Sequence, residues 1–115
     1  MNLSTPVARA TVALAGCATL ALAFFTGEAL AGPADAFVNI KNFDFQPMAV
    51  SIPVGATVTW KNLDEEPHTV TSTSGAFRSE ALDEGDSFRF KFTRPGVYKY
   101  LCTVHPKMTA TVTVK

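Results

Sequence analysis

The chain has few histidines, cysteines and tryptophans and no excess of charge of either sign. Its 115 residues include only two histidines, two cysteines and one tryptophan, and its ten basic side chains are balanced by ten acidic ones. A net charge of zero gives no indication of the basic face that binding to nucleic acid needs, so we do not expect a nucleic-acid partner. No segment keeps a helical hydrophobic period for three turns, so strand patterns dominate the sequence.

The first 31 residues differ in composition from the rest. Residues 1–9 are polar with one positive charge, residues 10–25 are nearly all apolar, and Ala29-Leu30-Ala31 has the small-x-small form of a signal-peptidase site. We predict that residues 1–31 are a secretory signal peptide, removed to leave a periplasmic domain of residues 32–115. Polar residues and a glycine interrupt the apolar run, so we expect no stable membrane insertion after its removal.

A lipid anchor is the alternative for this segment. Leu14-Ala15-Gly16-Cys17 resembles a bacterial lipobox, which would make Cys17 a lipidated N-terminus. The residues that follow Cys17 stay apolar, whereas the tether of a lipoprotein normally becomes polar. We therefore favour cleavage after Ala31.

Cleavage leaves Cys102 as the only thiol of an exported domain, without a partner for an internal disulfide. An unpaired cysteine in an oxidising compartment is protected when it is buried or bound to a metal. A metal ligand, an inert buried residue and an intermolecular disulfide are the three possibilities, and we favour the metal ligand.

The hydrophobic pattern of the remaining chain is typical of β-strands. Apolar and polar residues alternate in five segments, at residues 38–41, 50–54, 57–60, 88–92 and 110–115. One apolar face per strand predicts antiparallel sheets packed over a single core, and hence an all-β sandwich with Greek-key connections. Residues 73–83 are the least regular and leave room for a short helical turn.

One short segment gathers three kinds of metal donor. From Cys102 to Met108 the sequence is Cys-Thr-Val-His-Pro-Lys-Met, and His68 is the only histidine besides His105. Two imidazoles, a thiolate and a weak thioether form the ligand set of blue-copper electron-transfer centres, whereas zinc sites rarely use a thioether. Alone, each residue has a structural explanation, as a turn histidine, a buried cysteine or a core methionine. Their spacing predicts a single copper ion bound by His68, Cys102, His105 and Met108.

The nearest approach to a charged run is Asp64-Glu65-Glu66, just before Pro67 and His68. Clusters of this size are common on protein surfaces, so we expect a solvated loop rather than a docking site.

Several segments together resemble a known family. Residues 55–62, Pro67-His68, residues 96–102 and the loop from Cys102 to Met108 are similar to the cupredoxins, the family of plastocyanin and azurin. The Cys-x-x-His-x-x-Met loop looks most like that of the amicyanins. The resemblance implies a cupredoxin-like β-sandwich with His68, Cys102 and His105 as equatorial copper ligands and Met108 as the axial one. It also implies that the edge of His105 is the solvent-facing port for electrons.

The sequence departs from this family at two points. Many members carry Asn directly after the first histidine, where it ties that loop to the residue after the cysteine; here the two positions are Thr69 and Thr103, and two hydroxyls can form a similar bond with shorter reach. Amicyanins surround the second histidine with an apolar docking patch, which Lys107 interrupts here. An amine-dehydrogenase partner is therefore not assumed.

The expected function is that of a monomeric one-electron carrier between redox proteins such as cytochromes, dehydrogenases or oxidases. An enzyme is not expected, because the ligand set leaves no open copper position for a substrate. The alternative is a periplasmic copper carrier or buffer protein, which would be expected to have extra methionines or histidines for handover. Beyond the four ligands the domain has only Met48. A metal-free binding sandwich is the third possibility.

Overall fold

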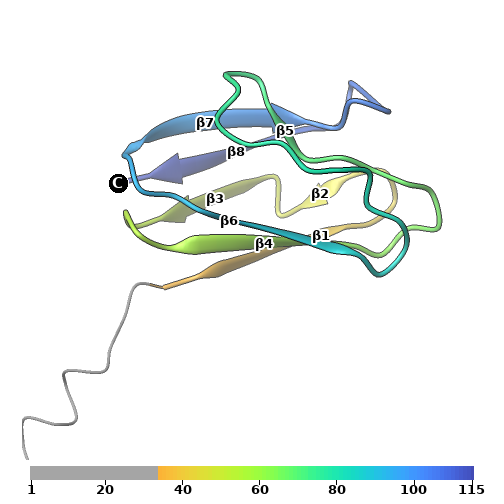
Figure 1. Ribbon diagram of the computed structural model, residues 1–115, viewed down its shortest axis with the longest axis horizontal. Helices are drawn as coiled ribbons and strands as arrows, with labels where there is room; N and C mark the ends of the chain where they lie inside the picture. Colours follow the sequence, from red (N-terminus) through yellow and green to blue (C-terminus); the bar gives the residue numbers. More distant parts are fainter. Residues whose placement is uncertain (1–33) are drawn as a thin grey trace, which may run out of the picture. The chain divides into compact units, whose positions relative to one another are not determined.

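The computed structural model describes residues 34–115, which form eight β-strands and no helix (Figure 1). The strands are β1 (Ala36–Ile40), β2 (Phe45–Gln46), β3 (Ala49–Ile52), β4 (Thr57–Asn62), β5 (Thr71–Ser72), β6 (Ser87–Lys91), β7 (Gly96–Leu101) and β8 (Thr109–Val114). The all-β prediction is confirmed for this part of the chain.

The strands form two four-stranded sheets that pack face to face. One has the order β2-β1-β4-β6 and the other the order β3-β8-β7-β5. In Figure 1 the blue strands β7 and β8 lie above the green and orange strands β4 and β1. From β3 to β7 each strand lies in the opposite sheet from the strand before it, so the chain crosses repeatedly between the two layers. This is the predicted β-sandwich.

The prediction of purely antiparallel sheets is wrong for two strand pairs. β1 runs parallel to β4, from Ala36 opposite Val58 to Ile40 opposite Asn62, and β3 runs parallel to β8. The pairs β4–β6, β5–β7 and β7–β8 are antiparallel. Alternation of apolar and polar residues indicates only that a strand buries one face. In a two-layer sandwich, parallel and antiparallel strands both do so. The hydrophobic pattern therefore could not determine strand direction.

The core lies between the sheets and is rich in aromatic rings. Trp60 and Tyr100, one from each sheet, are almost fully buried and meet edge to face with ring centroids 5.5 Å apart. Phe77 packs 5.6 Å from Trp60, although it belongs to an irregular segment. Aromatic pairs at such distances add about 0.5–1.5 kcal/mol beyond the burial of their area. This packing gives the loops at the ends of the sheets a rigid base.

Residues 73–83 contain no helical turn; they lie along the segment that carries His68. Isolated bridges join Thr71 to Arg78 and His68 to Leu82. The His68 N–H donates to the Leu82 carbonyl at 3.1 Å, and the Leu82 N–H donates back to the His68 carbonyl at 2.7 Å. Through these bridges the irregular segment fixes the backbone of His68.

The predicted signal peptide, its cleavage site after Ala31 and the alternative anchor at Cys17 lie outside the described residues and stay predictions. Within residues 34–115, no helix has the length and apolar character needed to cross a membrane.

Candidate metal centre

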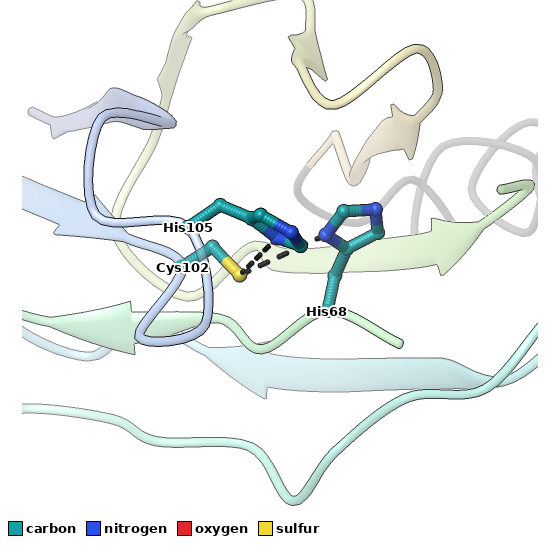
Figure 2. Close-up of side chains that lie close together, drawn as sticks. All are labelled: His68, Cys102 and His105. Carbon is teal, nitrogen blue, oxygen red and sulfur yellow. Dashed lines mark hydrogen bonds between the residues drawn. The ribbon is translucent and has the colours of Figure 1, made fainter. Parts of the chain in front are cut away.

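Two separate segments bring three potential metal donors together at one end of the sandwich. His68 lies between β4 and β5, Cys102 directly follows β7, and His105 lies in the loop between β7 and β8. Figure 2 shows the three side chains pointing toward one another. The Cys102 Sγ atom is 3.7 Å from Nδ1 of His68 and 3.9 Å from Nδ1 of His105. All three donor atoms lie within 4.8 Å of one another.

These separations match the size of a shared metal ion. A metal about 2.0 Å from a histidine nitrogen and about 2.3 Å from a cysteine sulfur holds the two atoms about 3.7 Å apart when the angle between the bonds is about 120°. Two nitrogens and one sulfur in a trigonal arrangement suit copper, and a weak axial donor completes such sites. The donor set therefore fits copper without a rearrangement of the chain.

A buried carboxylate fixes the orientation of the His68 ring. Nε2 of His68 lies 2.9 Å from Oδ2 of Asp64, and both side chains are buried. With the Nε2 proton donated to this carboxylate, Nδ1 keeps its lone pair and faces Cys102. A carboxylate behind a ligating histidine sets the tautomer and the orientation of its ring.

The solvated-loop prediction for residues 64–66 is wrong for Asp64 and holds for Glu65 and Glu66, which are exposed. Burial raises the pKa of Asp64, but the hydrogen bonds donated by the Phe43 and Asn42 N–H groups and by His68 outweigh it and leave the pKa below its usual value. Asp64 is therefore a structural anion rather than a surface charge.

Asn62 shapes the same loop. It occupies a fully buried position at the end of β4, where its Nδ2 group donates to the carbonyls of Glu66 at 2.9 Å and Leu82 at 2.8 Å. Its Oδ1 accepts the Asp64 N–H at 2.9 Å. Sequence analysis gave neither Asn62 nor Asp64 a role at the site. The sequence does contain a signal for Asn62: it is a polar residue two positions after Trp60, where the alternation of the strand predicts an apolar one.

The cysteine sulfur is held from the opposite segment. The Thr69 N–H donates to Cys102 Sγ at 3.3 Å, and Oγ1 of Thr69 lies 2.8 Å from Oγ1 of Thr103. Thr69 Oγ1 also accepts the Thr103 N–H at 2.8 Å. The two threonines thus link the segments that carry His68 and Cys102, as expected from their hydroxyl groups.

Met108 closes the loop through its backbone. Its N–H donates to the His105 carbonyl at 2.8 Å, and its carbonyl accepts the Cys102 N–H at 3.1 Å. The side chain is buried, at 5% exposure. The backbone of Met108 is thus tied to Cys102 and His105, and its role as an axial ligand stays a prediction.

His105 is half-buried and borders the surface. A hollow of about 550 Å³ lies beside it, lined by Phe43, Asp44 and the loop residues from Val104 to Met108. Lys107 is exposed there, so the apolar surface around His105 is interrupted as expected. The contribution of Phe43, from a distant loop, had no signal in the sequence.

Comparison with known proteins places these features in one family. Residues 12–114 match the family model described as a cupredoxin-like domain. Amicyanin-alpha of Methylorubrum extorquens is 37% identical over 93 residues, which cover 76% of each protein. Amicyanin of Paracoccus versutus is 36% identical over 89 residues, covering 72% of this chain and 67% of the relative.

A solved structure of a purple cupredoxin from Nitrosopumilus maritimus shares the fold. Its TM-score is 0.65 at 38% identity, over 70% of this chain and all of that protein.

Proposed function

The chain belongs to the cupredoxin-like family, and from this we propose that it is an exported type 1 copper protein that carries single electrons between redox partners. The proposal depends above all on one observation, the convergence of the His68, Cys102 and His105 donor atoms. Copper bound there would supply reversible one-electron chemistry between its Cu(I) and Cu(II) states. We propose His68, Cys102 and His105 as equatorial ligands and Met108 as the axial one.

The surrounding residues favour electron transfer because they hold the donors still. Asp64 fixes the His68 ring, and the Thr69 N–H fixes the Cys102 sulfur. The bond between Thr69 and Thr103 ties together the two segments that carry these donors. A donor set that moves little between two oxidation states lowers the reorganisation needed for each electron.

Electrons would pass through the edge of His105, which borders the surface hollow. We propose cytochromes, dehydrogenases or oxidases as the class of partner, with the protein acting as a monomer in the periplasm. Lys107 places a positive charge on this surface, so a partner that docks there must accommodate it.

A copper carrier or buffer is the second candidate. Handover of copper between proteins is aided by additional sulfur or imidazole donors beside the site. His68 and His105 are the only histidines of the chain, and Met48 lines a different hollow, with Thr73 and Lys99. This distribution favours electron transfer. An enzymatic role is not proposed, because the four ligands leave no open metal position for a substrate.

The direct experiment is a titration of the metal-free protein with Cu(II), followed by voltammetry. An intense visible band that saturates at one equivalent, together with a reversible one-electron wave, is expected. A colourless protein that prefers zinc to copper would contradict the proposal. Strong copper binding without a reversible wave would favour the carrier.

The axial ligand is tested by Met108→Gln. An amide oxygen is a harder donor than a thioether and stabilises Cu(II) relative to Cu(I), so copper should stay bound while the reduction potential falls. An unchanged potential would show that Met108 only fills the core.

A further inference from the structure

The Phe43 ring lies against both imidazoles of the proposed copper site. Its centroid is 5.3 Å from that of His68 and 4.9 Å from that of His105, with interplanar angles of 87° and 85°. Phe43 is 45% exposed, so the contact lies at the surface. An edge-to-face contact of this kind favours one orientation of each ring.

The loop that carries Phe43 is fastened to the site by Asp64. Asp64 Oδ1 accepts the Asn42 N–H at 2.7 Å, and Oδ2 accepts the Phe43 N–H at 2.9 Å. The turn is closed by reciprocal backbone hydrogen bonds between Lys41 and Asp44. The same carboxylate holds Nε2 of His68. One buried side chain therefore connects the loop and the first imidazole.

The loop backbone has an unusual conformation at the same place. Asn42 and Phe43 have φ angles of 56° and 57°, in the left-handed region. Asn adopts this region readily, but a bulky aromatic residue does so rarely and at a cost in free energy. Such a conformation persists when surrounding contacts impose it, and it occurs often at functional sites. Here those contacts are the two hydrogen bonds to Asp64.

His105 has few other restraints. Among the residues that the structure describes, no carboxylate pairs with its ring as Asp64 does with that of His68. The ring borders the hollow on one side and contacts the Cys102 sulfur on the other. Its aromatic neighbours are the buried His68 ring, 5.0 Å away between centroids, and Phe43, which is the one of the two that lies at the surface.

We propose that residues 41–44 form a strap, fastened by Asp64, that presses the Phe43 ring onto His105 and keeps this exposed imidazole in its metal-binding orientation. Phe43 is then a positioning residue that acts through His105. The inference rests on the proposed copper function, because the orientation matters only if His105 binds the metal. It also predicts that Asp64 influences both imidazoles, one directly and one through Phe43.

The test measures how fast the Cu(I)-loaded protein loses copper to the chelator bicinchoninate. Loss of His105 from copper opens the site, so Phe43→Ala should raise the rate about tenfold. Phe43→Tyr keeps the ring and should stay within about twofold of the wild type. Val104→Ala is the matched control, since Val104 is 51% exposed and lines the same hollow. It should also stay within about twofold, which separates easier access of the chelator from release of His105.

Equal rates for Phe43→Ala and Val104→Ala would overturn the strap. If the wild-type protein fails to bind copper at all, the proposed function fails, and the strap is then tested in the metal-free protein. Nuclear Overhauser contacts from the Phe43 ring to both imidazoles are expected there, and Asp64→Asn should weaken those to His105 as well as those to His68. Absence of the contacts in the wild type, or their full retention in Asp64→Asn, would overturn the inference.

Discussion

The two histidines of the site are held in different ways. His68 is fully buried, its backbone is bridged to Leu82, and a buried carboxylate binds the far side of its ring. His105 is half-buried in an exposed loop, and its ring is bordered by the Cys102 sulfur, the His68 and Phe43 rings and a surface hollow. The first imidazole belongs to the interior of the fold and the second belongs to its surface.

The contrast between a buried and a half-buried histidine corresponds to two separate requirements of an electron carrier. The site must stay rigid between oxidation states, which buried hydrogen bonds ensure, and it must come close to a partner, which requires an exposed edge. Assigning the requirements to different histidines lets one end of the site be stiff while the other is accessible. Changes on the His68 side should therefore alter stability, and changes on the His105 side should alter access to the metal.

The largest effect is expected from a change of Cys102, which lies between the two histidines. Cys102→Ser removes the sulfur that both imidazoles face, and with it the thiolate-to-copper charge transfer that gives the visible band. The copper-loaded variant should lose this band completely, as measured by absorption spectroscopy. Far-ultraviolet circular dichroism of the metal-free variant serves as the control for folding. Persistence of an intense band would show that a different residue supplies the sulfur.

The contrast between the histidines is tested by cavity variants. His105→Gly should open a gap that added imidazole can enter from solution, so the visible band should return as imidazole is titrated. His68→Gly should not be rescued, because the ring is fully buried and Asp64 loses its partner. Equal rescue of both variants would contradict the distinction between an interior and a surface ligand.

Asp64→Asn should weaken the His68 side. The amide keeps the volume, but it loses the charge that accepts the Asn42, Phe43 and His68 donors. Loss of such charged hydrogen bonds costs about 2 kcal/mol in the free energy of unfolding. Urea denaturation of the metal-free protein at neutral pH measures the difference, and Asp35→Asn, an exposed position, is the control.

The pH dependence of that difference has a definite sign. The pKa of Asp64 is lowered on folding from 3.8, so its contribution to stability is complete above this value and is lost as the pH falls through the lower folded-state pKa. The difference in the free energy of unfolding between the wild type and Asp64→Asn should thus become smaller only in acid, below about pH 4. A gap that narrows near neutral pH would show that a different group is responsible.

The smallest effect is expected at the bond between the two ligand segments. Thr103→Val removes the hydroxyl of an exposed residue, while the Thr103 N–H keeps its bond to Thr69. We expect a loss of about 0.5–1 kcal/mol in the free energy of unfolding, measured by urea denaturation. Thr69→Val should cost more, because Thr69 Oγ1 accepts that N–H as well. The reverse order would contradict the role given to Thr69.

The sequence predicts those features that depend on local pattern. Alternating residues such as Val58 and Trp60 indicate the strands, and the spacing of Cys102, His105 and Met108 groups them on one loop. His68 is singled out because histidine is rare in the chain. These inferences need no knowledge of which strands pair.

The features that sequence analysis missed depend on contacts between distant segments. Asp64 is buried because the loop at Asn42 and Phe43 folds onto it from 22 positions earlier, and no local pattern reports that approach. The parallel pairing of β1 with β4 arises in the same way, from the path of the chain between sheets. The irregular segment 73–83 gains its structure from its bridges to Thr71 and His68 rather than from a helix.

The placement of three proposed donors on the loop from Cys102 to Met108 has a consequence for folding. Since these proposed donors are neighbours in sequence, we expect an unfolded chain to bind copper already, through a thiolate, an imidazole and a thioether. His68, 34 positions before Cys102, joins them when β5 pairs with β7. A metal that also binds the unfolded state stabilises the native state only by the difference in affinity. For this chain that difference would come mainly from His68 and the packing around it, so copper could be captured before folding and secured by it.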